Sequence, residues 1–174
     1  MPKQKCVFLD RDGVLNLERG DYTYKPEDFE VLPGVPETLA LLKANGFLLI
    51  VVTNQGGIAK QLYKKEEVLA CHNKLQASCN NLIDALYYAP SHPAYSESLF
   101  RKPDSLMLER AIAKYNIDPA ASWMVGDSLR DLEAAEKVGV RSVLVGDKYE
   151  SGTYPVQVHD LKEAAQVILG DKVL

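Results

Sequence analysis

Residues 47–52, six apolar residues in a row, constrain the fold more strongly than any other part of the sequence. Continuous apolarity over this length indicates a strand that is buried on both faces, as in the middle of a parallel sheet. Short strand-like segments alternate with segments of helical periodicity along the rest of the chain. The sequence therefore predicts an α/β protein in which a central parallel sheet lies between helices, with right-handed crossovers.

The expected elements follow this alternation from one end of the chain to the other. Strands are expected at residues 6–9, 47–52, 86–89, 122–126, 141–145 and, at an edge, 156–159. Helices are expected at residues 35–45, 64–85, 105–115, 128–138 and 161–169. We expect residues 1–174 to form a single domain without a large cap domain, with a disordered tail near Leu174.

Charge and hydropathy exclude several classes of protein. The net charge of −4 argues against a protein that holds nucleic acid through a basic surface. No apolar run reaches the length of a membrane span, and residues 1–5 lack the apolar core of a signal peptide. Three cysteines are an odd number without a disulfide framework, and Cys71 and Cys79 share an apolar helical face that favours core packing. We expect a cytoplasmic monomer with no nucleic-acid or membrane partner.

Two carboxylates follow the first expected strand. Asp10 ends it and Asp12 comes two positions later, before a glycine that lets the backbone turn. Because like charges a few ångströms apart oppose each other, a divalent cation is expected here, and Mg²⁺ prefers oxygen ligands. One carboxylate can then attack phosphorus while the other transfers protons. A solvated turn is the simpler alternative, whereas a calcium loop is excluded because its sixth position is Leu15 and not glycine.

Polar residues also follow the other expected strands. Thr53 to Gly56 offer a hydroxyl and amides to phosphate oxygens, although a simple turn would use similar residues. Lys102 could stabilise a bound phosphate or simply cover a surface. Asp127 ends a strand where a third metal-directed carboxylate belongs, and Asp131 could belong to a helix cap. Because the carboxyl ends of parallel strands share one crevice, we expect these groups to converge there.

Four segments of the sequence resemble the motifs of the haloacid dehalogenase (HAD) superfamily, in the right order. They are FLDRDGVLN, VVTNQGGIA, RKP and MVGDSLRDLEAA. The form DRDGVLN, together with TNQ and YYAPSHP, is similar to the histidinol-phosphate and D-glycero-D-manno-heptose 1,7-bisphosphate phosphatases. The resemblance implies a three-layer α/β/α Rossmann-like HAD fold. It also implies a magnesium-dependent phosphomonoester hydrolase that acts on a small phosphorylated metabolite through an aspartyl phosphate.

The resemblance also implies a role for each matching residue. Asp10 would be the nucleophile and Asp12 the acid and base, while Thr53 and Lys102 would stabilise the transferred phosphoryl group. Magnesium would be held by Asp10, the backbone carbonyl of Asp12 and Asp127, with Asp131 supporting these ligands. The expected substrate-binding residues are Arg11, Glu18, Arg19, Gly20, Asp21, Asn54, Gln55, Gly56, Arg101 and Ser128.

The sequence departs from this family at the positions that would hold zinc and at two others. The zinc positions are occupied by Ala89, Ser91, Ser98 and Phe100, so zinc is not expected and His92 is expected to be a loop residue. Ser128 stands where these relatives tend to have lysine, and Leu106 where they have glycine. Heptose bisphosphate is the expected substrate. Histidinol phosphate or another sugar phosphate is the alternative, and a catalytically silent phosphate-binding module is the alternative of another class.

Overall fold

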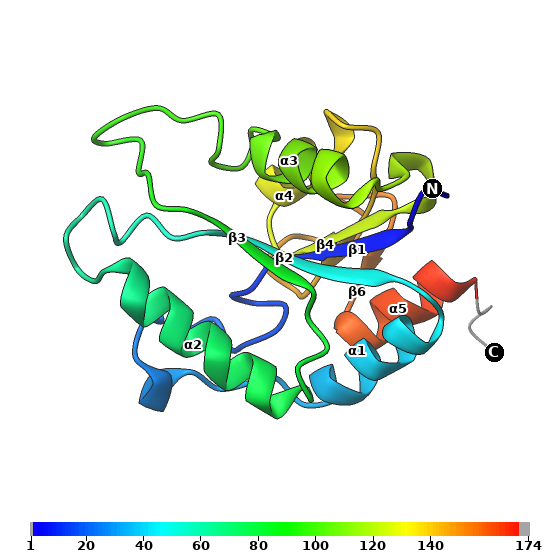
Figure 1. Ribbon diagram of the computed structural model, residues 1–174, viewed down its shortest axis with the longest axis horizontal. Helices are drawn as coiled ribbons and strands as arrows, with labels where there is room; N and C mark the ends of the chain where they lie inside the picture. Colours follow the sequence, from blue (N-terminus) through cyan, green and yellow to red (C-terminus); the bar gives the residue numbers. More distant parts are fainter. Residues whose placement is uncertain (1, 171–174) are drawn as a thin grey trace.

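Six parallel strands form one sheet in the order β3-β2-β1-β4-β5-β6 in the computed structural model, which describes residues 2–170 (Figure 1). The strands are β1 (Cys6–Leu9), β2 (Leu48–Asn54), β3 (Ala85–Ala89), β4 (Trp123–Gly126), β5 (Arg141–Val145) and β6 (Gln157–Val158). This is the parallel α/β sheet that the alternating sequence pattern predicted, with the Rossmann-like fold that the family resemblance implied. The expected disordered tail near Leu174 lies outside the described residues.

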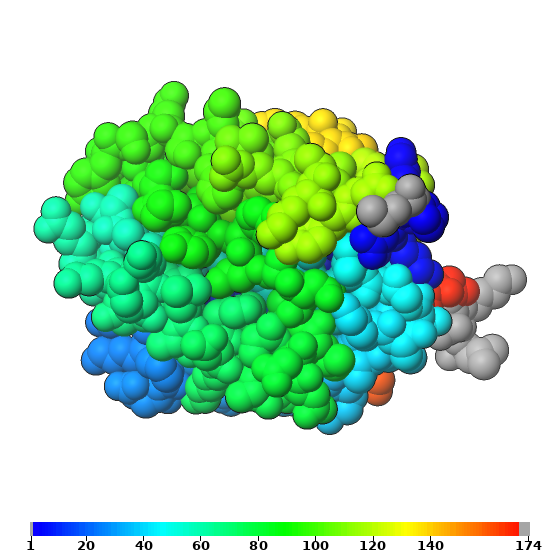
Figure 2. All heavy atoms as spheres, in the orientation of Figure 1, coloured from blue at the N-terminus to red at the C-terminus, as the bar shows by residue number. Residues whose placement is uncertain are grey.

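Helices cover both faces of the sheet. They are α1 (Val35–Ala44), α2 (Lys65–Ser78), α3 (Leu106–Tyr115), α4 (Leu129–Glu136) and α5 (Leu161–Leu169), with short 3-10 turns η1 (Pro26–Asp28) and η2 (Pro119–Ala121). In Figure 1, α3 and α4 lie on one side of the strands and α1, α2 and α5 on the other. Figure 2 shows green atoms, the colour of the edge strand β3 in Figure 1, filling the space between α2 and α3 in this view. None of the helices within residues 2–170 is long and apolar enough to cross a lipid bilayer.

Strand β1 shows how the sequence pattern produces two cores. All four of its residues are buried, and side chains alternate between the faces of a strand. Val7 and Leu9 join the cluster formed with α1, α2 and α5, whereas Cys6 and Phe8 join the cluster formed with α3 and α4. Because β1 lies between β2 and β4, the residues that follow these three strands meet at one edge of the sheet.

The second helix is shorter than predicted. Helix α2 ends at Ser78, although the apolar periodicity predicted a helix to residue 85. Asn80 and Asn81 adopt left-handed backbone conformations with φ of 51° and 56°, which asparagine tolerates better than most residues. Cys79 therefore follows the helix rather than lying within it, yet it is fully buried in the same core as Cys71.

Candidate active site

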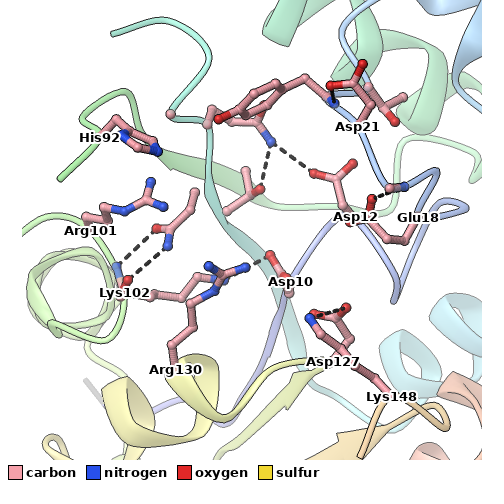
Figure 3. Close-up of a pocket in the computed structure, with 17 residues that line it drawn as sticks. Asp10, Asp12, Glu18, Asp21, His92, Arg101, Lys102, Asp127, Arg130 and Lys148 are labelled. Carbon is pink, nitrogen blue, oxygen red and sulfur yellow. Dashed lines mark hydrogen bonds and ion pairs between the residues drawn. The ribbon is translucent and has the colours of Figure 1, made fainter. Parts of the chain in front are cut away.

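A cavity of about 590 Å³ opens at the carboxyl ends of the central strands (Figure 3). The structure brings twelve of the expected site residues to its wall, which are Asp10, Asp12, Glu18, Gly20, Asp21, Thr53, Asn54, Gln55, Gly56, Arg101, Lys102 and Asp127. They come from β1, β2, β4 and the loops that follow these strands or precede α3. The convergence predicted from strand order is therefore present.

Two carboxylates that line the cavity, Asp10 and Asp127, lie close to a third, Asp131, which is fully buried. Asp10, Asp127 and Asp131 each offer an oxygen within 4.8 Å of the other two. The Lys102 Nζ lies 2.9 Å from Asp10 Oδ1 and 2.7 Å from Asp131 Oδ1, and its side chain is 1% exposed. Lys102 therefore pairs with two of the three acidic groups, Asp10 and Asp131.

The pKa values of these groups reflect this excess of acidic charge. Burial raises the pKa of Asp10 to about 7, and the charges of Asp131 and Asp127 act in the same direction against Lys102. Burial and the nearby Asp131 also raise the pKa of Asp127. Burial alone would lower the pKa of Lys102, but Asp10 and Asp131 together raise it. Two neighbouring carboxylates that are costly to ionise, Asp10 and Asp127, fit a divalent cation.

Two glycines allow this cluster to form so close to the backbone. A Cβ atom on Gly13 would lie 2.6 Å from Asp127 Oδ2, and one on Gly126 would lie 2.4 Å from Asp131 Cβ. Asp131 also accepts a hydrogen bond from the backbone N–H of Ser128 at 3.1 Å, which caps α4. Asp131 thus serves both as a helix cap and as a partner of Lys102.

Asn54 positions Lys102 through a pair of hydrogen bonds. Its side-chain Nδ2 donates to the carbonyl of Lys102 at 2.9 Å, and its Oδ1 accepts from the backbone N–H of Lys102 at 3.0 Å. Lys102 Nζ also donates to the carbonyl of Val52 at 2.7 Å. The Asn54 side chain, which was expected to bind phosphate, also joins the end of β2 to the segment before α3.

Asp12 is held by three side chains. Arg11 Nη2 donates to its two oxygens at 2.9 and 3.1 Å, Asn16 Nδ2 donates to Oδ1 at 3.0 Å, and Gln55 Nε2 donates to Oδ2 at 3.1 Å. Arg11 is only 1% exposed and also donates to the carbonyl of Thr23 at 2.7 Å. Arg11 was expected to bind substrate, but it lies behind Asp12 and does not line the cavity.

Two further residues expected to bind substrate also lie off the cavity wall. Arg19 forms an ion pair with Asp28 at 3.0 Å on the protein surface. Ser128 is 6% exposed, and its hydroxyl lies 3.4 Å from the hydroxyl of Tyr149. Both predictions rested on their nearness to a motif in the sequence, and proximity along the chain does not determine which way a side chain points.

Five residues that were not predicted to bind substrate complete the wall, namely Tyr22, Thr23, His92, Arg130 and Lys148. Arg130 lies in the first turn of α4, one residue before Asp131, so its position within the fourth motif could have identified it. Lys148 follows β5, where no motif marks it, and its Nζ lies 3.9 Å from Asp127 Oδ2. His92 is a loop residue, as expected, but it also lines the cavity.

Three cationic side chains gather on one side of the cavity. Figure 3 shows Arg101, Lys102 and Arg130 on one side, with Asp12 and the acidic residues Glu18 and Asp21 on the other. Burial, and then the charge of Arg130, lowers the pKa of Arg101, so the two guanidinium groups interact unfavourably without an anion between them. This side of the cavity is suited to a negatively charged group.

The chain is similar over most of its length to enzymes that act on a heptose bisphosphate. It is 40% identical over 148 residues to the D-glycero-beta-D-manno-heptose-1,7-bisphosphate 7-phosphatase of Haemophilus ducreyi, which covers 80% of this chain and 81% of that protein. The chain belongs to the heptose-bisphosphate phosphatase family. Another member of this family, the 7-phosphatase of Thermosynechococcus vestitus, is 36% identical over 171 residues, or 88% of this chain and 86% of that one.

The family assignment extends to the superfamily and to the fold. A HAD-hydrolase-like family model matches residues 99–164, which contain the third and fourth motifs. The D,D-heptose 1,7-bisphosphate phosphatase of B. bronchiseptica, solved with magnesium and phosphate, superimposes with a TM-score of 0.87 at 31% identity, over 97% of this chain and 99% of that one. The protein is therefore a HAD phosphatase, as the order of the four motifs predicted.

Proposed function

We propose that this phosphatase is a magnesium-dependent D-glycero-D-manno-heptose 1,7-bisphosphate 7-phosphatase that works through an aspartyl phosphate. The observation that carries the proposal is the placement of Asp10, Asp127 and Lys102 at the floor of an open cavity, with Asp12 beside them. The substrate and the bound magnesium and phosphate named for its relatives support it.

The acidic cluster supplies the ligands for the metal. Asp10, Asp127 and the backbone carbonyl of Asp12 would hold Mg²⁺, and Asp131 would support them from below. When bound, the ion supplies positive charge that neutralises these carboxylates and the phosphate oxygens. Lys102 remains as the protein's own cation against the reacting group, because it is fixed by Asp10, Asp131 and the Val52 carbonyl.

The chemical steps use Asp10 and Asp12. A carboxylate oxygen of Asp10 attacks phosphorus, the bond from phosphorus to the sugar oxygen breaks, and Asp12 gives its proton to that oxygen. Asp12 then takes a proton from water, which attacks the aspartyl phosphate and releases inorganic phosphate and free Asp10. The hydroxyl of Thr53 and the ammonium of Lys102 hold the transferred phosphoryl oxygens in both steps.

The side of the cavity that carries Arg101 and Arg130 would bind a second phosphate of the substrate. Arg101 is oriented by a hydrogen bond from its Nη1 to the carbonyl of Ser91 at 2.9 Å. Gly56 leaves room for it, since a Cβ there would lie 3.1 Å from the same nitrogen. Arg130 forms no ion pair within residues 2–170 and is exposed to the cavity. A phosphate between Arg101 and Arg130 would relieve their mutual repulsion, whereas a monophosphate would leave it in place.

A phosphate-release assay tests the proposed function. The purified protein is offered heptose 1,7-bisphosphate, other sugar phosphates, histidinol phosphate and nucleotides, with and without Mg²⁺, and Asp10→Asn is the control. We expect Mg²⁺-dependent release that is fastest with heptose bisphosphate and abolished in the variant. Faster release from histidinol phosphate would favour the alternative substrate, and wild-type protein that binds phosphate but releases none would make the chain a silent binding module.

We also propose that the enzyme works as a monomer in the cytoplasm. All three cysteines, Cys6, Cys71 and Cys79, are free and buried, which suits a reducing compartment. Light scattering of the purified protein measures the oligomeric state, and a mass twice that of the chain would refute the monomer.

A further inference from the structure

We propose that Tyr63 is a positioning residue for proton transfer, which acts through Gln55 to aim the carboxyl group of Asp12 at the leaving oxygen. This inference rests on the proposed function, because it assigns to Asp12 the protonation of the sugar oxygen. Tyr63 lies outside the cavity wall and outside all four sequence motifs.

A continuous line of hydrogen bonds joins the three residues. The hydroxyl of Tyr63 donates to Gln55 Oε1 at 2.7 Å. The Nε2 of the same amide donates to Asp12 Oδ2 at 3.1 Å, one of the contacts drawn at Asp12 in Figure 3. It also donates to Thr53 Oγ1 at 2.9 Å. Tyr63 and Gln55 are 5% and 2% exposed, so the hydrogen bond between them is shielded from water.

The phenol determines which end of the amide faces Asp12. An amide has a donor end and an acceptor end of nearly the same shape. Because Tyr63 donates to the oxygen, the two N–H groups are directed toward Asp12 and Thr53. A reversed amide would place its oxygen against the Asp12 carboxylate, where two acceptors repel each other. Burial raises the pKa of Tyr63 well above its usual value, so the hydroxyl keeps its proton and remains a donor.

Packing fixes the ring that carries this hydroxyl. Tyr24 stacks on Tyr63 with ring centroids 5.0 Å apart, and Tyr22 meets it edge-on at 5.9 Å. On another side, a Cβ on Gly57 would lie only 2.1 Å from a ring carbon of Tyr63, so the backbone there is in close contact with the ring. The hydroxyl therefore has little freedom to leave Gln55.

One amide thus aligns two groups on either side of the bond that breaks. Arg11 donates to both oxygens of Asp12 and Asn16 donates to Oδ1, and Gln55 adds a second contact to Oδ2. Thr53 accepts from Gln55, so its own hydroxyl proton is left for the phosphoryl group. Removal of the phenol hydroxyl would leave the side chains in place but allow the amide to turn.

The test compares Tyr63→Phe with wild type on two substrates that differ in their need for an acid. A sugar phosphate releases an alcohol that must be protonated, whereas p-nitrophenyl phosphate releases a stable phenolate. Because kcat/KM includes steps only up to the first irreversible one, it reports the first half-reaction. We expect kcat/KM to fall about tenfold for the sugar phosphate, within the usual range for general acid catalysis, and by less than about twofold for p-nitrophenyl phosphate.

Tyr24→Phe is the matched control, because the Tyr24 hydroxyl makes no hydrogen bond within residues 2–170 while its ring packs on the same neighbour. We expect it to leave both values of kcat/KM unchanged. If kcat/KM of Tyr63→Phe fell equally on the two substrates, or did not fall on the sugar phosphate, the inference would be overturned. The proposed function would remain intact. Wild-type protein inactive on both substrates with Mg²⁺ would overturn the proposed function, and this inference with it.

Discussion

Lys102 is the residue on which both the stability and the chemistry of the site depend. We expect Lys102→Met to lower the free energy of unfolding by about 3 to 5 kcal/mol, because Asp10 and Asp131 would remain buried without their cation. We also expect kcat to fall by about 10²-fold or more, since a charge aimed at the phosphoryl group is lost. Urea unfolding and steady-state kinetics measure the two effects.

Lys137→Met is the control for this change. Lys137 forms an ion pair with Asp104 at 2.8 Å, but the two side chains are 46% and 43% exposed. Such surface pairs contribute at most about 1 kcal/mol. If both substitutions changed stability equally, the buried cluster would not be the source of the difference.

Arg130 should determine the preference for a second phosphate. We expect Arg130→Gln to lower kcat/KM for a sugar bisphosphate by about 10- to 100-fold, the loss of one charge-assisted contact, with little effect on the corresponding monophosphate. Arg141→Gln is the control, because Arg141 stacks on Trp123 at the other end of the sheet. If Arg130→Gln lowered kcat/KM equally for the bisphosphate and the monophosphate, Arg130 would not contact the second phosphate.

At the scale of elements, carboxylates from β1, β4 and α4 share one site, so metal binding should be linked to proton release. The pKa of Asp10 is raised to about 7, so the metal-free protein keeps a proton on this cluster below pH 7 and loses it as the pH rises through 7. Mg²⁺ binds the ionised form. The affinity of the protein for Mg²⁺ should therefore rise as the pH increases through 7, and it should be about tenfold weaker at pH 6 than at pH 8.

Isothermal titration calorimetry in buffers of different ionisation enthalpy counts the protons released. At pH 6 we expect close to one proton per Mg²⁺ bound, and far fewer at pH 8. A dissociation constant that is the same at both pH values would show that the cluster is already ionised without the metal.

The loop at residues 90–100 should fold without zinc. The family resemblance places zinc ligands at Ala89, Ser91, Ser98 and Phe100, and none of these residues is a usual zinc ligand. We expect a zinc-selective chelator to leave the melting temperature unchanged, whereas EDTA abolishes activity that Mg²⁺ then restores. Thermal unfolding and an elemental assay of the purified protein check this, and about one zinc per chain would refute it.

The elements show what sequence pattern can and cannot predict. Apolar runs located β1, β2 and β4, and the order of strands then brought Asp10, Thr53 and Asp127 together. The end of α2 was missed because apolar spacing continues past Ser78, while the backbone turns at two asparagines that carry no strong breaker signal. Apolar residues of helix α2 and of the segment that follows Ser78 are buried in the same core, so apolar periodicity alone does not show where the helix ends.

At the scale of the whole molecule, residues that line the cavity were easier to predict than residues that lie behind its wall. Asp12 and Gln55 lie in motifs, but Tyr63 lies among polar residues and its partner is defined only by the tertiary structure. Arg11 was wrongly expected to bind substrate, because a charged residue inside a motif usually suggests exposure. In the structure it is buried. That residues 1–174 form a single domain stays a prediction.

The open cavity has a consequence for the timing of turnover. Within residues 2–170, the connection between β1 and α1 contains only the short η1 turn, and no added sheet or helical bundle covers the acidic floor. In many enzymes kcat is limited by the opening of a lid that lets the product leave. Here the dephosphorylated sugar can depart by the entrance it used, so solvent viscosity should leave kcat almost untouched.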